Sequence, residues 1–347
     1  MGSHCLEQPP GPERDPSRAA ENATVGTANS PSAWIDARER SQHYPMPSVS
    51  VIMPCFNHGA YVRDSMHSIL AQTMSDLELL VVDDFSTDTS RERVMEVMKL
   101  DSRVRLLCHP KNLGVSKSRN DGIAAAKGKY LAFCDADDLW LPEKLARQLP
   151  ALEAQSHYGL AYCESEIIDQ NGVWTGRKFS DDHPAPRPSG NTFNDLCRTN
   201  FINTQTVIVR RDLLPADLRF DEKIRRTEDW WLWLQLARKT AFVYDPTVLA
   251  QYRVHPTSTR ATQANGYHRD NWKVCKKNLR LHRDMPLPEQ GLMWYSMGYG
   301  LCALGKRRWG RAFMAHALSC AVRGRAPLGR TLRMAARWLH FSLFARS

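Results

Sequence analysis

The sequence predicts an α/β protein with a mostly parallel central sheet that helices flank. Short apolar runs alternate with helix-like segments in the first half of the chain, and the runs lack the polar alternation of a half-exposed strand. Strands of that kind are buried on both faces, as in sheets covered by crossover helices. The chain has 347 residues, of which 42% are hydrophobic, so it can bury a large core.

Each element of the first half follows from a local pattern. Between the first two apolar runs, Val62, Met66 and Ile69 recur on one helical face. Strands are expected at 49–53, 77–82, 104–107 and 130–134, and helices at 60–73, from after Asp88 to about Leu100, and at 115–126.

The second half is more mixed and ends in helices. We expect strands at 160–168, 204–210 and 241–244, a Trp-rich helix at 228–239, and helices at 268–283, 289–304, 307–322 and 328–344. Residues 1–45 are rich in Pro, Ala, Ser and charge without a hydrophobic period, which predicts a disordered leader. The expected organisation is therefore the leader, an α/β domain over 46–262 and a basic helical region over 263–347.

Composition limits the cellular setting. The nine cysteines are scattered without a CxxC pair, which favours reduced thiols and a cytoplasmic protein over a disulfide scaffold or a zinc ribbon. No stretch of 18 apolar residues is present, so the sequence predicts no membrane span. The N-terminus lacks the apolar core of a secretory signal.

Positive charge is concentrated in the C-terminal tail. Residues 270–347 carry 15 Lys and Arg against 3 Asp and Glu. Within this segment, residues 290–347 carry 10 Lys and Arg and no Asp or Glu. Within 328–344, apolar residues recur at helical spacing beside Arg330, Arg333 and Arg337. Residues 324–347 can be an interfacial helix on the anionic inner face of a membrane, or a helix that packs on the domain with a solvated basic face. Both interpretations stay open.

Three carboxylates follow a buried strand directly. Asp135, Asp137 and Asp138 lie within four residues and would repel one another unless a cation sits between them. Oxygen ligands suit Mg²⁺ or Mn²⁺, and such an ion can hold a diphosphate. The alternative is a solvated acidic turn without a metal. Taken alone, the Asp135–Asp138 motif favours this alternative over a metal site.

Two further acidic groups lie at element boundaries. Asp84 follows the second strand, where its carboxylate can bind a base or a ribose hydroxyl, while the residues after it can cap the next helix. Thr227 can cap the Trp-rich helix, which puts Glu228 and Asp229 in the first turn. Trp230 and Trp231 then form dry walls or a sugar-stacking surface, or belong to the core.

Together these motifs are similar, in order and spacing, to those of family 2 glycosyltransferases. The similarity covers about residues 47–258 and is carried by Val49–Met53, Pro54, Asn57, Gln72-Thr73, Val81–Asp84, Asn112–Gly114, Arg119-Asn120, Ala126–Gly128, Asp135–Asp138, Thr227–Trp230 and Tyr252–His255. It implies a Rossmann-like GT-A fold, a nucleotide-diphosphate sugar donor, a divalent metal (Mg²⁺ or Mn²⁺) and inversion at the anomeric carbon. The helical pattern of the last residues adds a C-terminal helical extension to this fold.

The resemblance also implies roles for individual residues. Asp229 corresponds to the catalytic base, which takes a proton from the acceptor hydroxyl. Pro54, Phe56, Asn57, Asp84, Arg119 and Asp135 correspond to the nucleotide site, and Asp137, Asp138 and His255 to the metal site. From the residues themselves, we expect Glu228, Trp230 and Trp231 at the acceptor or sugar pocket. Phe85 stands where the family usually has a glycine in this turn. Because Phe resists positive φ, the sequence does not establish that the turn has the family's usual conformation.

The expected function is sugar transfer, and other functional classes are the alternatives to it. A UDP-sugar donor and a glycan or lipid-linked acceptor in cell-envelope polysaccharide or glycolipid synthesis are the expectations from the family, and no nucleic acid partner is expected. The alternative is a non-catalytic nucleotide-sugar or nucleic-acid binding protein that uses the basic tail. No dinucleotide-binding glycine motif follows the first strand, and no P-loop or kinase motif set is present.

Overall fold

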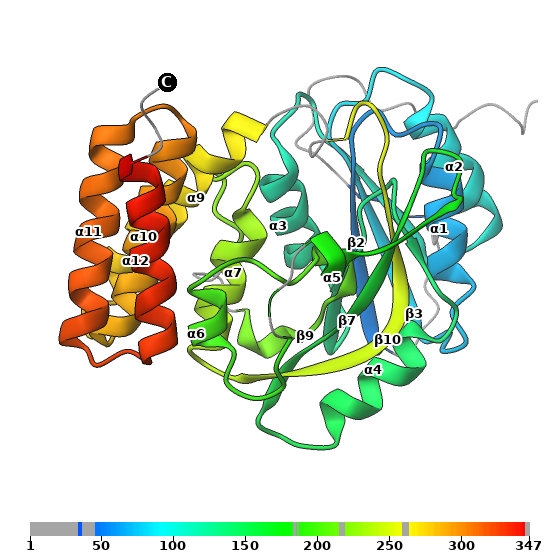
Figure 1. Cartoon of the computed structure of the whole chain (residues 1–347). Coiled ribbons are helices and arrows are strands. Elements are labelled where there is room, and N and C mark those ends of the chain that lie inside the picture. The colour runs from blue at the N-terminus through cyan, green and yellow to red at the C-terminus, as the bar shows by residue number, and fades with distance from the viewer. Residues whose placement is uncertain are drawn as a thin grey trace, which may run out of the picture. The chain divides into compact units, whose positions relative to one another are not determined.

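The computed structural model describes residues 34–36, 46–182, 185, 187–214, 219–258 and 264–343, and the rest of the predicted leader lies outside them. A central sheet is flanked by helices, and further helices follow at the C-terminus (Figure 1). The strands are β1 (Trp34–Asp36), β2 (Val49–Cys55), β3 (Leu77–Asp83), β4 (Val104–Cys108), β5 (Tyr130–Phe133), β6 (Leu139–Trp140), β7 (Tyr158–Ile168), β8 (Trp174–Lys178), β9 (Ile208–Arg210) and β10 (Ala241–Arg253). The helices are α1 (Val62–Leu70), α2 (Ser90–Leu100), α3 (Val115–Ala125), α4 (Lys144–Glu153), α5 (Phe179–Asp182), α6 (Phe193–Leu196), α7 (Glu228–Ala237), α9 (Ala264–Leu281), α10 (Leu287–Ala303), α11 (Arg307–Arg323) and α12 (Leu328–Leu343).

The sheet is mixed, and the predicted parallel strands stand together within it. Its strand order is β1-β4-β3-β2-β5-β9-β7-β10-β6, with β8 paired to β7. The pairs among β4, β3, β2 and β5 are parallel, as predicted, and so is β7 with β10. Strand β9 runs antiparallel to both β5 and β7. An apolar run indicates burial but not strand direction, so the reversal at β9 was not predictable from it.

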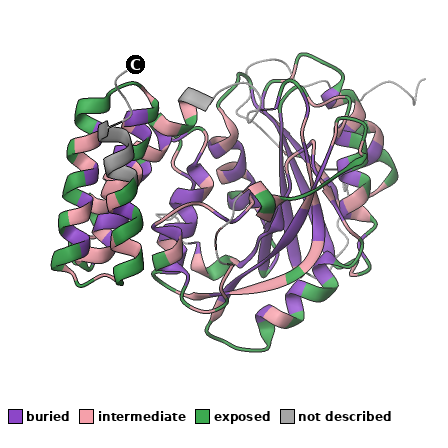
Figure 2. Ribbon diagram, viewed as in Figure 1, coloured by how far each residue is buried: buried purple, intermediate pink, exposed green. Residues whose placement is uncertain are grey.

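Helices cover both faces of the sheet. Along β2, Val51 and Met53 join one core cluster with residues of α1, α2 and α4, whereas Ile52 joins the other with residues of α3 and α7. Alternate side chains of a strand point to opposite faces, so both faces of β2 are buried. Figure 2 shows the central strands β2, β3 and β5 as buried, whereas β10 is only partly buried.

Three expected elements differ from the structure. Residues 34–36, within the predicted disordered leader, form β1, which pairs with β4 and holds the Arg105 guanidinium 5.0 Å from the Trp34 ring centre. The expected strand at 204–210 divides into a 3₁₀ turn, Thr204–Thr206, and β9. The expected strand at 241–244 continues to Arg253 through register shifts after Asp245.

The four C-terminal helices form where the sequence predicts them. Residues of α9 and α10, including Val274 and Met293, share a core cluster with Trp231 and Trp233 of α7. A smaller cluster of Ala317, Ala321 and Met334 joins α11 to α12. In the described part of the chain, no helix combines the length and apolar character needed to cross a bilayer.

Candidate active site

A cavity of about 720 Å³ opens at the carboxyl ends of the central parallel strands. Ligands of open α/β sheets bind at this edge. The first half of the chain contributes Pro54, Phe56, His58, Asp84, Arg119, Asp135 and Asp137 to its lining, and the second half contributes Asn200, Thr204, Arg225, Arg226, Glu228, Asp229, Tyr252, Tyr267 and His268. The volume lies in the range of small-molecule sites, about 300–1,000 Å³.

At one end of the cavity, Asp84 holds a loop in place. Its Oδ1 accepts a hydrogen bond from the main-chain N–H of Leu113 (2.7 Å) and its Oδ2 accepts one from Gly114 (2.7 Å). The same carboxylate contacts Nδ1 of the buried His109 (2.8 Å), whose Nε2 lies 3.0 Å from Asp121. Asp84 therefore shapes the predicted nucleotide site through the loop before α3, besides facing the cavity.

The turns after β2 and β3 are joined by hydrogen bonds between side chains and main-chain N–H groups. Asn57 has φ of 57° and Phe85 has φ of 69°, so both non-glycine residues adopt the left-handed conformation. The Asn57 side-chain oxygen accepts from the N–H of Thr87 (2.8 Å), and the Asn57 N–H donates to Ser86 Oγ (3.0 Å). Asn57 is absent from the cavity lining, so its observed contacts fix the turn, whereas Pro54 and Phe56 beside it do line the cavity.

Asp88 satisfies the start of the next helix. Its carboxylate accepts a hydrogen bond from the N–H of Ser90 at 2.9 Å. Asp88 therefore provides the capping that the sequence suggests for the residues after Asp84. Asp84 itself lines the cavity.

Arg119 joins two carboxylates at the centre of the cavity. Its guanidinium, on α3, donates to Asp135 (2.7 Å) and to Glu228 (2.6 Å). Burial lowers the pKa of Arg119, and the two carboxylates more than offset that effect, so the pKa is raised. Burial raises the pKa of Glu228 to about 7 despite the arginine. Asp135 and Glu228 are thus engaged with a cation of the protein itself.

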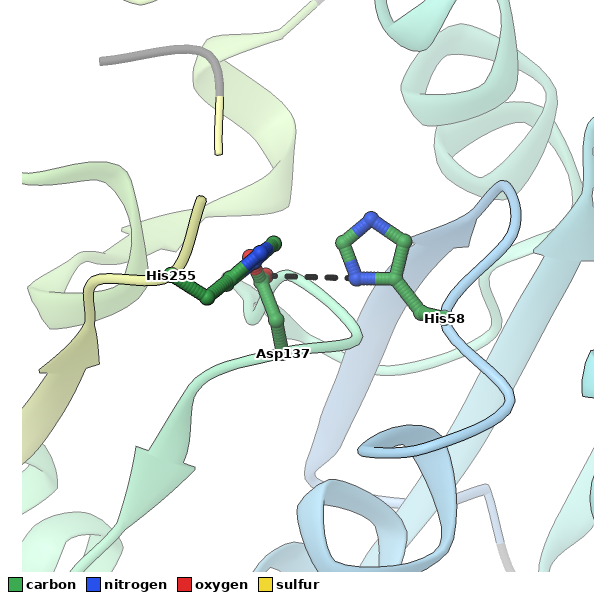
Figure 3. A group of neighbouring side chains, drawn as sticks. All are labelled: His58, Asp137 and His255. Atoms are coloured by element: carbon green, nitrogen blue, oxygen red, sulfur yellow. Dashed lines mark hydrogen bonds and ion pairs between the residues drawn. The ribbon is translucent and has the colours of Figure 1, made fainter. Parts of the chain in front are cut away.

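A second group, His58–Asp137–His255, joins three segments distant in sequence (Figure 3). Asp137 Oδ2 lies 3.0 Å from His255 Nε2, and Oδ1 lies 3.7 Å from His58 Nδ1. Burial raises the pKa of Asp137, but the two histidines more than offset it, so the pKa is lowered and the carboxylate stays ionised. The buried His58 Nδ1 has no hydrogen-bond partner within the described residues. These three donors fit a divalent metal.

Asp138 lies away from this group, which corrects its assignment to the metal site. It is 1% exposed, is absent from the cavity lining, and accepts a hydrogen bond from the main-chain N–H of Arg253 (2.9 Å). Burial raises its pKa well above the usual range. The side chain of Asp138 ties the acidic loop to the end of β10, so the three neighbouring aspartates have different surroundings.

Asp229, at the start of α7, presents its carboxylate to the cavity. Its Oδ2 accepts from Asn200 Nδ2 (3.0 Å) and Thr204 Oγ1 (3.1 Å), and Oδ1 accepts from its own neighbour, the Trp230 N–H (2.7 Å). Burial raises the pKa of Asp229, although Arg119 and these hydrogen bonds oppose it. The N-cap position is Thr227 as predicted, but its side chain makes no capping hydrogen bond.

Trp230 and Trp231 belong to the core, which decides between the two interpretations of the sequence. They are 1% and 5% exposed, and neither lines the cavity. The indole N–H of Trp230 donates to the carbonyl of Leu196 at 2.7 Å. Only Glu228 of the three residues predicted for the acceptor pocket faces the cavity.

Sequence reasoning missed several cavity residues. His58 stands beside the polar strand end that was singled out, so its position was a usable signal. Asn200, Thr204 and Tyr267 carry no local motif, since only the tertiary fold brings them to the cavity of Asp229.

Comparison with known proteins identifies the family. The family model described as Glycosyl transferase family 2 matches residues 50–215. The Escherichia coli protein WfgD, named a UDP-Glc:α-D-GlcNAc-diphosphoundecaprenol β-1,3-glucosyltransferase, is 34% identical over 55% of this chain and 70% of that protein. The chain belongs to glycosyl transferase family 2.

A further relative is similar in sequence, and solved structures share the fold. TuaG of Bacillus subtilis, named for teichuronic acid biosynthesis, is 29% identical over 75% of this chain and 98% of that protein. The structure of S. aureus TarS with UDP-GlcNAc matches with a TM-score of 0.58, 17% identity and coverage of 79% and 81% of the two chains. The mannosyltransferase PcManGT of Pyrobaculum calidifontis, solved with GDP-Man and Mn²⁺, gives 0.55, 18% and 89% of each chain. The predicted GT-A fold and glycosyltransferase class are confirmed.

Proposed function

We propose that this family 2 glycosyltransferase moves a sugar from a UDP-sugar to a hydroxyl of a glycan or lipid-linked acceptor, with inversion, in cell-envelope polysaccharide or glycolipid synthesis. The named activity of WfgD supports a lipid diphosphate acceptor, and the UDP-GlcNAc complex of TarS supports a UDP-sugar. Arg225 and Arg226 line the same cavity as Asp229, and their positive charge suits an acceptor that carries phosphate.

The state of Asp229 is the observation that carries the proposal. Its neighbour Glu228 is occupied by Arg119, whereas Asp229 is held by the neutral donors Asn200 and Thr204. Burial raises the pKa of Asp229, which makes it a stronger base than a free aspartate. Asp229 is therefore suited to take the acceptor proton during a single displacement at the sugar C1.

The remaining cavity residues orient the donor and balance its charge. Arg119 can contact a phosphate oxygen while Asp135 and Glu228 fix its guanidinium in place. When bound, a divalent ion at His58, Asp137 and His255 would offset negative charge on the departing diphosphate. Pro54 and Phe56 supply the apolar walls of the base end.

We further propose a cytoplasmic location with peripheral attachment to the inner membrane face through 324–347. Leu328 and Leu332 of α12 are 74% and 58% exposed. They stand in a region that has no acidic residue from 290 to 347. Exposed leucines beside arginines suit an anionic lipid surface. Side chains from residue 337 onward lie outside the described part, so the proposal rests on the first turns of α12.

Replacing Asp229 tests the proposed reaction. Purified protein is supplied with UDP-sugars, Mn²⁺ and GlcNAc-diphosphate-lipid, and both sugar transfer and UDP binding are measured. Loss of a positioned base costs about 10²–10⁴-fold in rate, so Asp229→Asn is expected to lose kcat by that factor while UDP affinity is kept. Asp64→Asn, an exposed aspartate on α1, is the matched control. Full sugar transfer by Asp229→Asn would refute Asp229 as the base, and UDP binding without any transfer by the wild type would favour non-catalytic binding instead.

A further inference from the structure

The imidazole of His58 has an unusual environment, and the family resemblance assigned this residue no role. Its Nδ1 atom is buried without a hydrogen-bond partner in the described part of the chain and points at Asp137 (Figure 3). A buried polar nitrogen left without a partner is costly. Nδ1 lies 3.7 Å from Asp137 Oδ1, on the opposite carboxylate oxygen from His255. The arrangement leaves room for an atom between imidazole and carboxylate.

We propose that His58 is a ligand of the divalent metal, and that the His58–Asp137–His255 group binds a transition-metal ion such as Mn²⁺ before any nucleotide arrives. This deepens the proposed function, on which it rests for the use of the metal. A site with only one or two carboxylates needs the donor diphosphate to complete its hold on the ion. Three protein ligands supply that hold in advance.

The distances suit a single ion. Two ligands at about 2.1 Å from an ion, in adjacent octahedral positions, lie about 3.0 Å apart. The observed separations from Asp137 oxygens are 3.0 Å to His255 and 3.7 Å to His58. All three donor atoms lie within 4.8 Å of one another. Small side-chain rotations are enough to bring them to bonding distance.

Each ligand is held from behind, so the group is prepared for binding. The outer nitrogen of His255, Nδ1, lies 2.9 Å from Thr257 Oγ1, and the His255 ring packs 4.9 Å from the ring of Tyr61. The main-chain N–H of His58 donates to Ser90 Oγ at 2.8 Å. The Thr257 contact is of the kind that orients a metal-binding imidazole, whereas the Ser90 contact fixes the backbone of His58.

The backbone of the third ligand is held as well. The carbonyl of Asp137 accepts a hydrogen bond from Arg253 Nε at 2.7 Å. Since the strand β10 that carries Arg253 leads directly to His255, the two ligands Asp137 and His255 are fixed relative to each other. Little ordering is left for the metal to impose.

The donor set selects the class of metal. Mg²⁺ prefers oxygen ligands and water. Imidazole nitrogen suits Fe²⁺, Ni²⁺ and Zn²⁺, and a site with nitrogen and oxygen ligands holds Mn²⁺ more weakly than these ions. Two histidines and one carboxylate on one side of an octahedral ion leave the other positions open for water and diphosphate oxygens. The sequence named Mg²⁺ or Mn²⁺ from the oxygen ligands of the acidic loop and assigned one histidine, His255, to the metal site. The second histidine, His58, moves the expected preference away from Mg²⁺.

Mn²⁺ titration of the whole chain without nucleotide tests the proposal, with free Mn²⁺ followed by electron paramagnetic resonance. One Mn²⁺ is expected per chain, and an equal concentration of Mg²⁺ should displace little of it. Changes around bound metals commonly cost about 10–100-fold in affinity, so His58→Ala should weaken Mn²⁺ binding by at least about tenfold. His67→Ala, an exposed histidine on α1, should leave binding unchanged.

Two measurements separate the possible failures. Melting temperatures in EDTA show whether His58→Ala folds, and His58→Gln repeats the titration with a polar side chain that lacks imidazole. Unchanged Mn²⁺ affinity in both variants, or wild-type binding only after UDP is added, overturns the proposal. Because the titration needs no sugar, a protein that binds Mn²⁺ through His58 but transfers no sugar would refute the proposed reaction and leave the metal site intact.

Discussion

Arg119 shows how much depends on one buried cation. Its side chain is 3% exposed and is flanked by Asp135 and Glu228. Removing one partner from a buried ion pair typically costs about 3–5 kcal/mol, because the remaining charges are left unpaired. We expect Arg119→Ala to lower the free energy of unfolding by about that amount, measured by urea denaturation.

A surface arginine provides the control for that measurement. Arg63 and Glu96 form an ion pair at 3.6 Å with side chains 49% and 45% exposed. Exposed pairs contribute about 0–1 kcal/mol, so Arg63→Ala should change little. Equal losses in the two variants would contradict the assigned role of Arg119.

His109 makes stability depend on pH. Burial alone lowers its pKa, but the contacts with Asp84 and Asp121 more than offset burial and raise the pKa above its ordinary 6.5. A raised folded-state pKa stabilises the fold fully below pH 6.5, and this contribution is lost as pH rises through the folded-state pKa. Asp84 remains ionised there because its own pKa is lowered.

Thermal melting between about pH 5.5 and pH 8.5 measures this contribution. The melting temperature of the wild type should exceed that of His109→Gln most at the acidic end, and the difference should shrink as pH rises. His67→Gln on α1 serves as the control and should show a constant difference from the wild type. A difference that grows with pH would refute the ion pair with Asp84.

At the residue scale, the sequence predicted the acidic loop but could not assign a separate role to each of its aspartates. Asp135, Asp137 and Asp138 are equivalent in a one-dimensional pattern. Their partners are Arg119 on α3, two histidines, and the backbone of Arg253, all distant in the chain. The left-handed turn at Phe85 was questioned for good physical reason, and the locking contacts between Asn57 and Thr87 explain how the turn persists.

At the element scale, the strands and helices that could be predicted were those with a clear pattern of buried apolar residues. Strands β2, β3, β4 and β5 and the helices between them were predictable because each is a local apolar pattern with polar ends. Strands β1 and β9 have three residues each, and their pairing depends on edges that other segments provide. Such short strands have too little pattern of their own.

The junction between α3 and β5 yields a test of close packing between elements. A Cβ on Gly128 would lie 2.5 Å from the main-chain nitrogen of Ser50 on β2, whose Oγ accepts from the Gly128 N–H at 2.8 Å. Overpacking costs about 1–3 kcal/mol, so Gly128→Ala should lower the free energy of unfolding by that amount. Denaturant titration measures it.

Gly329 supplies the matched control for the junction. A Cβ there would meet only Arg333 Nη1, at 3.8 Å, and the position is in the exposed helix α12. Gly329→Ala should be neutral or slightly stabilising, since alanine favours helix. Neutral behaviour of both alanine variants would mean that β2 and the junction are less tightly packed than the structure has them.

At the scale of the whole molecule, the catalytic half and the first C-terminal helices are not independent. Val274 of α9 and Met293 of α10 pack in the same cluster as the tryptophans of α7, the helix that starts with Asp229. Tyr267 and His268 of α9 also line the cavity. Sequence composition divided the chain at about residue 262, but it could not show that the helices beyond that point complete the core behind Asp229.

Helix α12 exposes apolar side chains, and vesicle flotation tests whether it binds lipid. It contributes Met334 to a small cluster and leaves Leu328 and Leu332 exposed. Burying a leucine in an apolar phase gains about 1.5–3 kcal/mol, which is about tenfold or more in affinity. Full-length protein should bind phosphatidylglycerol vesicles more than phosphatidylcholine vesicles, and added salt should weaken the binding.

The double variant Leu328→Ser, Leu332→Ser should lose most of this binding while sugar transfer to a water-soluble acceptor persists. Leu100→Ser is the control, because Leu100 is 81% exposed at the end of α2, away from the basic tail. Binding that ignores lipid charge, or that survives in the double variant, would mean that the leucines of α12 have another role. Arginines alone attract an anionic surface over about 8–10 Å, whereas the leucines act only once they enter it, so the two effects separate by their response to salt.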